Sequence, residues 1–320
     1  MTIPTVLLSS SGRRVELCQI LRSMDLRVVT VDAISDVPTR FTSTAFQQVA
    51  RIDSDDFIDD ILSVCEAHEV AIVIPTIDTE LDKYADARDR FSQLGIDLWV
   101  SSATTVGLAQ DKLRFFDFLV EAGDFPVIET VSLADVHARE VSLPAIVKPR
   151  FGSGSSHVQK VRSRAEMPLF ENPGDFVVQP LVEGVEYTVD FAVDREENLR
   201  GISCRERKKV SSGEVLTATT RHKPQFERVI ERLVPLLDEP YGLFNIQFFE
   251  NHEGFKILEL NARVGGGFPL SVAAGCNLIQ TLLGRSKTGV LRPKSGVTML
   301  RHDASFFFDE TDPRAGLLPC

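Results

Sequence analysis

The sequence predicts an α/β protein in which a doubly wound unit is followed by mixed α+β structure. In the first hundred residues, short apolar runs alternate with helical patterns, as expected when helices cover a parallel sheet. From about residue 108 the pattern changes, and most later strands are predicted to pair antiparallel. The 320 residues are 43% hydrophobic and 25% charged, which is typical of a globular enzyme with a large core and excludes a disordered chain.

The first domain is predicted at residues 1–107. Its strands are expected at residues 5–10, 26–31, 70–75 and 96–100, and its helices at residues 14–23 and 56–65. Residues 70–75 are continuously apolar, which is typical of a strand buried on both faces of a parallel sheet.

The second and third domains are predicted at residues 108–184 and 185–320. The second contains a helix that ends at Gly123, and its elements are expected at residues 112–121, 144–149 and 176–180. The third contains three antiparallel strands, one helix and a hairpin, expected at residues 186–193, 199–204, 215–220, 225–237, 244–250 and 255–261. Pro235 should interrupt that helix, because proline lacks the N–H that a helix interior requires.

Charge and composition exclude several classes of protein. With 35 basic and 46 acidic residues the net charge is −11, which argues against a general nucleic-acid binder. No apolar run reaches the roughly 18 residues of a membrane span, and the N-terminus lacks the pattern of a signal peptide. The five scattered cysteines form no CxxC pair, so we expect neither a disulfide framework nor a zinc site, and we expect a cytoplasmic protein.

A lysine at a predicted strand end precedes a loop of small residues. The lysine is Lys148, and the loop contains Gly152, Ser153, Gly154, Ser155 and Ser156. Small residues let backbone N–H groups approach phosphate oxygens, and the ammonium group offsets phosphate charge. The loop is not a Walker A sequence, and by itself it is more typical of a flexible surface turn than of a phosphate site.

A second segment, residues 176–190, consists of two strands joined by a short connector with acidic residues. Glu183 and Glu186 belong to this connector and to the start of its second strand. Such a connector can offer backbone groups to an adenine ring and a carboxylate to ribose hydroxyls. Taken alone, an ordinary hairpin with solvated acids explains it better.

The hairpin at residues 244–261 is the most informative segment. Residues two apart on a strand share a face, so Glu259 and Asn261 point together while Leu258 and Leu260 point into the core. If Gln247 lies opposite Glu259, the three polar side chains form one oxygen-rich cluster. Mg²⁺ bound together with phosphates prefers such ligands.

That same pairing implies a five-residue loop at residues 251–255. Arg263, two residues beyond the predicted ligand Asn261, can face the charge that develops on a transferred phosphoryl group. The alternative is a polar outer face on a half-buried hairpin.

These three motifs, in this order, resemble the ATP-grasp superfamily, and further segments narrow the resemblance to stand-alone carbamoyl-phosphate-synthase-like members. The further segments are residues 7–14, 75–81, 110–112, 205–207 and 261–271. The resemblance covers about residues 3–290. It implies an ATP-grasp fold: a Rossmann-like pre-grasp domain, a small lid and a larger C-terminal domain, with ATP clasped between the last two.

The resemblance also implies roles for individual residues. The positions expected to bind ATP are Lys112, Lys148, Gly152, Ser153, Gly154, Ser155, Ser156, Gln179, Val182, Glu183, Glu186 and Gln247. Lys112 and Lys148 match phosphate contacts. Gln179 and the backbone around Val182 match adenine contacts, although many relatives carry an acid in place of Gln179. Glu186 matches the ribose carboxylate, with Glu183 as the less favoured choice.

The metal ligands implied by the resemblance are Gln247, Glu259 and Asn261, holding two Mg²⁺ ions for which Mn²⁺ can substitute. Arg263 matches the arginine that faces an acyl-phosphate, and Lys148 and Arg205 complete the expected catalytic set. Ala262 replaces a proline common in this stretch.

Enzymes of this kind use ATP to convert a carboxylate into an acyl-phosphate, which an amine attacks to form an amide. For this chain the resemblance implies a small carboxylate, an amine or amino acid, and a homodimer as a common assembly. Substrate candidates lie at the end of the first strand, where open α/β sheets bind ligands, and near the glycines after Arg263. They are Ser10, Gly12, Arg13, Asp78, Glu80, Arg207 and Gly266.

Three other functions compete with this ligase. A dinucleotide-dependent oxidoreductase is disfavoured because the loop before Gly12 has no GxGxxG pattern, although Asp32 mimics a ribose-binding acid. A carbamoyl-phosphate-type or ammonia-using ligase with a partner subunit stays open, as does a catalytically silent ATP-binding regulator. The run of phenylalanines at residues 306–308 must be covered by the domain itself or by a partner.

Overall fold

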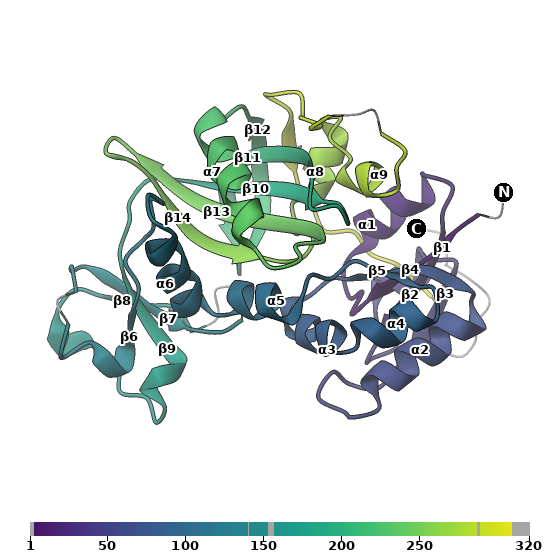
Figure 1. Cartoon of the computed structure of the whole chain (residues 1–320), viewed down its shortest axis with the longest axis horizontal. Coiled ribbons are helices and arrows are strands. Elements are labelled where there is room, and N and C mark those ends of the chain that lie inside the picture. The colour runs from purple at the N-terminus through teal and green to yellow at the C-terminus, as the bar shows by residue number, and fades with distance from the viewer. Residues whose placement is uncertain (1–2, 140, 153–156, 287–288, 309–320) are drawn as a thin grey trace. The chain divides into compact units, whose positions relative to one another are not determined.

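The computed structural model describes residues 3–139, 141–152, 157–286 and 289–308 (Figure 1). It divides into two compact units, Met1–Trp99 with Leu300–Cys320, and Val100–Met299. The sequence placed the first boundary at residue 107, which lies inside helix α5 (Ala103–Gln110). By this division the described residues 300–308 group with the first unit, and the third domain expected at residues 185–320 stays a prediction.

The first unit contains a five-stranded parallel sheet in the order β3-β2-β1-β4-β5. Its strands are β1 (Thr5–Ser9), β2 (Arg27–Asp32), β3 (Ala45–Gln48), β4 (Val70–Pro75) and β5 (Asp97–Leu98). Its α-helices are α1 (Val15–Arg22), α2 (Phe57–Ala67), α3 (Leu81–Asp86) and α4 (Arg88–Gln93). The central strand β1 is buried throughout, and the strand order is that of a doubly wound nucleotide-binding half, as the sequence predicts.

The second unit begins with α5 and α6 (Lys112–Ala122), which lead into a four-stranded antiparallel sheet in the order β6-β9-β7-β8. Its strands are β6 (Val131–Ser132), β7 (Ala145–Pro149), β8 (Gln159–Val161) and β9 (Phe176–Pro180). Small aliphatic side chains form its core, among them Val131, Ala145, Val147, Val161 and Val178. This small sheet matches the predicted lid.

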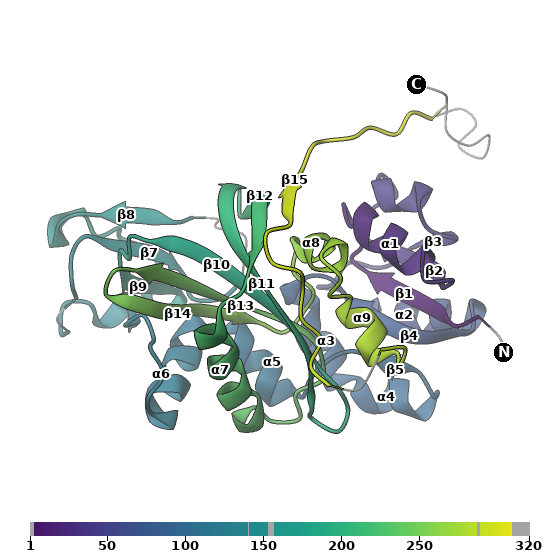
Figure 2. The same cartoon turned by 90° about the horizontal axis from the view of Figure 1, so that it is seen from above.

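A six-stranded sheet in the order β14-β13-β10-β11-β12-β15 completes the second unit. Its strands are β10 (Val185–Val193), β11 (Leu199–Ser211), β12 (Glu214–Arg221), β13 (Gly242–Asn251), β14 (Gly254–Asn261) and β15 (Thr298–Leu300). Helix α7 (Pro224–Leu233) lies against this sheet (Figure 2). The ring of its Phe226 stacks 4.3 Å from that of Phe248 on β13. Two short helices follow the sheet, α8 (Phe268–Ala273) and α9 (Leu278–Leu282).

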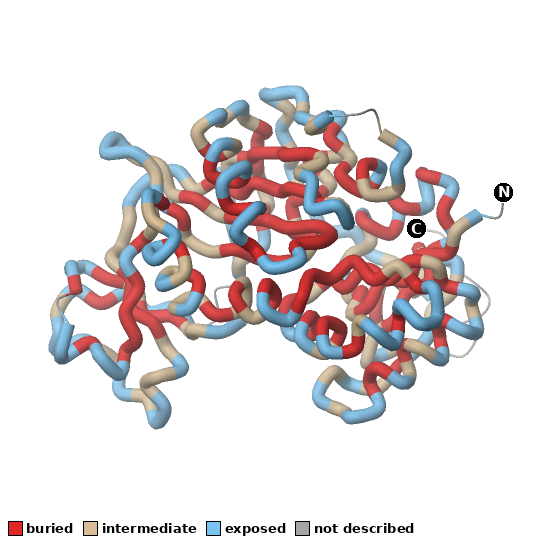
Figure 3. Tube along the Cα trace, in the orientation of Figure 1, coloured by how far each residue is buried: buried red, intermediate tan, exposed pale blue. Residues whose placement is uncertain are grey.

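Strand alternation gives this sheet one apolar and one polar face. Tyr187, Val189 and Phe191 alternate with Glu186 and other polar residues along β10. The apolar set is buried, and its pairing partners on β13 are apolar as well. Figure 3 shows long buried stretches along these strands. The polar face is therefore the face available for chemistry.

The predicted effect of Pro235 is confirmed, because α7 ends at Leu233 and a 3₁₀ turn, Val234–Leu236, contains the proline. No described helix is both long enough and apolar enough to cross a membrane.

The predicted five-residue loop of the hairpin is wrong. Asn251 pairs with Gly254, so only His252 and Glu253 form the turn. The register shifts between Gln247 and Phe248, which leaves Leu258 as an extra residue in a β-bulge. In consequence Leu258 is only half-buried, contrary to the prediction, and Ile257 occupies the core position.

The segment after β15 packs on the first unit. The rings of Phe306 and Phe308 lie 5.7 and 5.0 Å from that of Phe41. Arg301 pairs with Glu16 at 3.1 Å. The predicted aromatic patch is thus covered in part by the chain itself, although Phe307 stays 51% exposed.

Candidate functional site

Two rows of polar side chains cross the polar face of the six-stranded sheet. The antiparallel register aligns Arg205, Thr188, Gln247 and Glu259 on β11, β10, β13 and β14. Directly opposed residues of antiparallel strands point to the same side, so these four share one face. Gln247 lies opposite Glu259, which is the pairing that the predicted oxygen-rich cluster requires.

The second row consists of Ser203, Asp190, Asn245 and Asn261. The amide nitrogen of Asn261 donates to Asn245 Oδ1 at 3.2 Å, and Asn245 Nδ2 donates to the Arg263 carbonyl at 3.0 Å. Asn245 and Asn261 are both buried. These bonds fix the amide plane of Asn261 and leave its carbonyl oxygen as the atom able to act as a ligand.

A buried lysine faces this cluster from the small sheet. Lys148 on β7 is 8% exposed, and burial lowers the pKa of its ammonium to about 8. The carboxylates of Glu259 and Glu186 raise that pKa, whereas the charge of Lys112 lowers it further. Two lysines and two glutamates from four different elements therefore interact electrostatically at one place.

The predicted ribose carboxylate is paired within the site. Arg207 Nη1 lies 3.2 Å from Glu186 Oε1, and Arg207 also donates to the Gly213 carbonyl at 2.9 Å. Burial raises the pKa of Glu186, and the positive charges of Arg207 and Lys148 act against that rise. Burial likewise lowers the pKa of Arg207, which the charge of Glu186 opposes.

The start of α6 is tied to the end of β7. Asp111 caps α6 by accepting the N–H groups of Leu113 and Arg114, and it accepts both Nε and Nη2 of Arg150 at 2.8 and 2.7 Å. Burial alone would raise the pKa of Asp111, but the Arg150 hydrogen bonds dominate and lower it. Lys112 Nζ donates to the Gly152 carbonyl at 2.6 Å.

The remaining predicted nucleotide contacts have protein partners or fall outside the description. Gln179 is buried, and its amide nitrogen donates to Thr130 Oγ1 at 2.8 Å. The carbonyl of Glu183 accepts a bond from Asn251, and Val182 is half-buried. The other loop residues expected at the phosphates lie outside the described residues: Ser153, Gly154, Ser155 and Ser156.

The predicted catalytic arginines differ in setting. Arg263 Nη1 donates to the Val264 carbonyl at 3.0 Å, just after the end of β14. Arg205 is 2% exposed and forms a buried ion pair with Asp190. The chain then continues through Gly266 into α8.

In the first unit, Glu80 organises the loops at the carboxyl ends of β1 and β4. Its Oε2 accepts the hydroxyls of Ser9 and Ser10 at 2.6 and 2.7 Å. Its Oε1 accepts the N–H groups of Thr76 and Ile77 at 2.7 and 3.2 Å. Burial raises the pKa of Glu80, and these four hydrogen bonds oppose the rise.

The other substrate candidates of this unit lie at the same edge of the sheet. The N–H of Gly12 donates to Asp32 Oδ2 at 2.9 Å, and Asp78 is buried. Arg13 is exposed and pairs with Asp303 at 3.0 Å. In the sequence, Asp32 has the position of a ribose-binding acid. In the structure its carboxylate supports the loop after β1.

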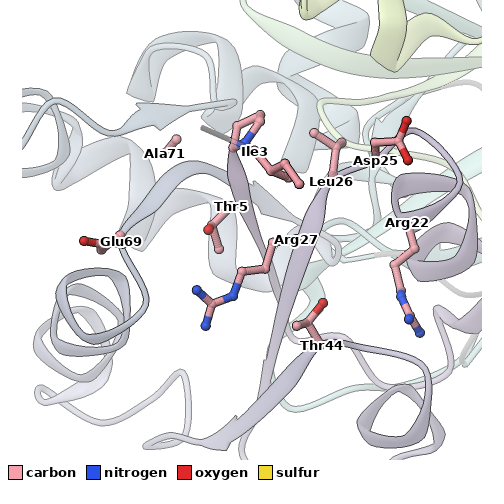
Figure 4. A pocket seen from close by; sticks show the side chains of 10 residues that line it. Ile3, Thr5, Arg22, Asp25, Leu26, Arg27, Thr44, Glu69 and Ala71 are labelled. Atoms are coloured by element: carbon pink, nitrogen blue, oxygen red, sulfur yellow. The ribbon is translucent and has the colours of Figure 1, made fainter. Parts of the chain in front are cut away.

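A pocket of about 850 Å³ lies at the opposite, amino-terminal edge of this sheet (Figure 4). Arg22, Asp25, Arg27 and Glu69 line it together with Thr44. The pocket thus contains two basic and two acidic side chains. It lies away from the loops that Glu80 organises.

The donor set of the hairpin fits a magnesium ion. Gln247, Glu259 and Asn261 offer oxygen atoms, which hard divalent cations prefer. Among the described residues no three His, Cys, Asp or Glu side chains form a metal cluster, so this set holds a single carboxylate. Such a set suits a cation whose remaining ligands are phosphates and water.

The sequence places Asn245 on the same face as Gln247, but sequence reasoning missed Thr188 and Asp190 as members of this face. The signal was the alternation of polar residues at every second position of β10, which continues from Glu186 through Thr188 to Asp190.

Comparison with known families matches two parts of the chain. Residues 6–99 match a family described as PylC-like, N-terminal domain. Residues 172–303, which include the two polar rows, match a family described as ATP-grasp in the biosynthetic pathway with Ter operon. Together with the matches below, these two matches support an ATP-grasp ligase. The predicted resemblance is therefore confirmed.

One curated relative is the carbamoyl phosphate synthase large chain of Clostridium acetobutylicum, 24% identical over 247 residues. The match covers 70% of this ATP-grasp chain but only 23% of that much longer protein. Similarly, pyruvate carboxylase of Rhizobium etli matches with a TM-score of 0.70 and 15% identity, over 89% of this chain and 29% of that one.

Two solved structures are similar over most of their length. N5-carboxyaminoimidazole synthetase of Staphylococcus aureus, complexed with ADP, has a TM-score of 0.74 at 14% identity and covers 94% of this chain and 83% of its own. An L-amino acid ligase of Bacillus licheniformis has a TM-score of 0.65 at 17% identity, covering 88% and 74%. These likenesses establish the ATP-grasp fold of this chain.

Proposed function

We propose that this protein is an ADP-forming carboxylate–amine ligase. ATP phosphorylates a small carboxylate, by our proposal that of an amino acid, to an acyl-phosphate. An amine, again by our proposal that of an amino acid, then displaces phosphate and forms an amide. The proposal includes a homodimer as the assembly, because dimers are common in this superfamily.

One observation carries the proposal: Lys148 from the small sheet faces Glu259 and Glu186 from the six-stranded sheet. Burial lowers the pKa of this ammonium to about 8, and the carboxylates of Glu259 and Glu186 oppose that effect, so the group is charged at neutral pH. A triphosphate with a divalent cation supplies both signs of charge that such a site accommodates.

The position of each residue in the site supports the role that we propose for it. Lys148 and Lys112 bind phosphate oxygens, since both ammonium groups belong to the same electrostatic cluster. Glu186 accepts ribose hydroxyls, and Arg207 holds that carboxylate in position. Gln247, Glu259 and Asn261 hold Mg²⁺, which neutralises phosphate charge when bound.

Arg263 faces the phosphoryl group that is transferred. Phosphoryl transfer needs positioning and charge neutralisation rather than a covalent nucleophile from the protein. Arg263 follows the ligand Asn261 closely along the chain, and Asn245 binds both its carbonyl and the amide of Asn261. An arginine whose backbone is held in this way can place its guanidinium group to stabilise charge on the acyl-phosphate.

The amino-acid assignment draws support from the similar fold of an L-amino acid ligase. The relative that is a carbamoyl phosphate synthase supports the alternative, an ammonia-using enzyme that works with a partner. Both reactions release ADP, so the product decides between them.

The test is mass spectrometry after incubation of the full chain with ATP, Mg²⁺ and pooled amino acids and small carboxylates. A second arm contains bicarbonate and ammonium instead. Lys148→Met is the inactive control, and Lys160→Met, on the exposed part of β8 in the same small sheet, is its matched control.

We expect ADP and a mass equal to two substrates minus water in the first arm, and neither with Lys148→Met. Product in the second arm alone would replace the proposed reaction with carbamoyl-phosphate chemistry. Formation of AMP would contradict an acyl-phosphate mechanism. Nucleotide binding without turnover in either arm would indicate a regulatory protein.

A further inference from the structure

The polar face contains a buried ion pair to which no step of the proposed reaction assigns a role. Asp190 on β10 and Arg205 on β11 pair with each other, and their side chains are only 2% and 3% exposed. Arg205 is too deeply buried to reach a substrate without a change in the surrounding structure. Its function must therefore operate through the residues that it contacts.

One contact is a hydroxyl from α8. Ser271 Oγ donates to Asp190 Oδ2 at 2.8 Å, and Ser271 is itself 1% exposed. Since α8 begins directly after the glycines at residues 265–267, this bond fixes one end of the glycine turn against the sheet.

The glycine turn lies directly on the guanidinium of Arg205. A methyl group at Gly265 would lie 3.0 Å from Arg205 Nη2 and 3.1 Å from Asp190 Oδ1. A methyl group at Gly267 would overlap Arg205 Nε and lie 2.8 Å from its Cζ. The distances at Gly265 are tight for a real side chain and those at Gly267 are too short for one, so the turn packs closely against the ion pair.

The other end of the turn connects to the proposed phosphoryl-transfer residues. Asn245 Nδ2 binds the Arg263 carbonyl, and a methyl group at Gly265 would lie 3.4 Å from that same nitrogen. Asn245 Oδ1 accepts the amide of Asn261. A continuous set of contacts thus leads from Ser271 through the ion pair to Arg263 and to a proposed metal ligand.

Energetics argue against a purely stabilising purpose for the pair. Asp190 Oδ1 and Arg205 Nε are buried without a hydrogen-bond partner in the described structure. A buried ion pair that leaves polar atoms unsatisfied contributes little to stability, since desolvation of both charges offsets their attraction. What such a pair does supply is a fixed geometry.

We propose that Asp190, Arg205 and Ser271 are positioning residues that hold the glycine turn at residues 265–267 and thereby orient Arg263 and Asn261. The inference rests on the proposed ligase function. It assigns Arg205 a role behind the reacting groups, in place of the direct catalytic role that the sequence predicts.

The test compares two buried serine hydroxyls in the full chain. Ser271→Ala removes the bond to Asp190, whereas Ser203→Ala removes a buried hydroxyl in the same polar row that has no hydrogen-bond partner in the described structure. Amide hydrogen exchange of residues 262–272 reports the turn. The affinity for Mn²⁺ in the presence of ADP, measured by electron paramagnetic resonance, reports the metal ligands. Both readouts are independent of turnover.

We expect faster exchange in residues 262–272 and weaker Mn²⁺ binding for Ser271→Ala, with Ser203→Ala equal to the wild type. With the substrates found in the ligase assay, kcat should fall about tenfold for Ser271→Ala and about 100-fold for Arg205→Lys, while KM for ATP stays within about twofold. The proposal is overturned if the loss of kcat among the variants simply follows their loss of thermal stability. It is also overturned if the two serine variants behave alike. A wild type without ligase activity refutes the proposed function separately, because exchange and Mn²⁺ binding still decide whether the pair holds the turn.

Discussion

Two acidic groups in this protein, one in each compact unit, have opposite surroundings: Glu80 is buried and Glu259 is half-buried. Glu80 in the first unit is enclosed by four neutral donors, two hydroxyls and two backbone N–H groups. Glu259 in the second unit belongs instead to a cluster of charges that includes Lys148 and Glu186.

The comparison distinguishes polar groups that stabilise the fold from polar groups that are available to bind a ligand. A carboxylate whose oxygens are satisfied by the protein stabilises the loops around it and has little capacity left for a ligand. A face on which ammonium and carboxylate groups oppose each other becomes fully satisfied only when a charged ligand arrives. The predictions below test this distinction, beginning with the largest expected effect.

Removing the buried ammonium should abolish activity while leaving the fold intact. Lys148→Met is expected to lower the rate of ADP formation by about 1000-fold, because a phosphate contact in a site shielded from water is lost. The free energy of unfolding should stay equal or rise, since burial disfavours the charge. Urea unfolding and an ADP-release assay measure both quantities. Unchanged activity in Lys148→Met would show that the charged cluster around Lys148 does not bind the nucleotide.

Removing the Glu80 carboxylate should lower the stability of the fold rather than the rate of the reaction. Glu80→Ala leaves buried donors without an acceptor and should lower the free energy of unfolding by about 3 kcal/mol or more, whereas Glu80→Gln retains acceptor and shape and should cost less. Urea unfolding compares the two variants. A stable Glu80→Ala protein that no longer binds the amine substrate would show instead that Glu80 contacts substrate, as the sequence predicts.

The lowered pKa of Lys148 predicts a pH dependence of nucleotide binding. Affinity for Mg²⁺-ATP should weaken as pH rises above about 8, by about tenfold at one unit higher, because the ammonium loses its proton. Calorimetric titration from pH 7 to 9.5 measures this effect, over a range in which the ATP charge is constant. A flat profile would show that Lys148 does not bind phosphate as the free ammonium.

The lowered pKa of Lys148 also predicts that the stability of the protein increases with pH, whereas nucleotide binding weakens. The unfolded chain holds the Lys148 proton up to its ordinary pKa of 10.5, more tightly than the folded protein. The contribution of Lys148 to the free energy of unfolding should therefore rise with pH between about 8 and 10.5. The difference between wild type and Lys148→Met in urea unfolding isolates this contribution.

The smallest effect is expected at Arg207. Arg207→Met should raise KM for ATP about threefold to tenfold by releasing Glu186 from its ion pair, with little change in KM for the carboxylate or the amine. Steady-state kinetics with each substrate varied in turn measures this. A larger change in KM for the carboxylate would support the substrate role that the sequence predicts for Arg207.

The sequence alone was sufficient for features set by local pattern. Alternating apolar runs and helices predicted the parallel sheet of the first unit, because a strand buried on both faces must be apolar along its length. The two-residue period likewise predicted that Glu259 and Asn261 share one face, which their pairing with Gln247 and Asn245 on β13 confirms.

The tertiary structure decided whatever depends on a distant partner. The bulge at Leu258 shortened the hairpin loop, because the register is set by pairing across strands rather than by either strand alone. The sequence offered Glu80 as a substrate contact and Arg205 as a catalytic residue, yet Glu80 binds two loops and Arg205 pairs with Asp190 inside the sheet. A side chain's chemistry is local, but burial and partners come from segments far apart in the chain. They determine whether its charge is satisfied by the protein or is left to face a ligand.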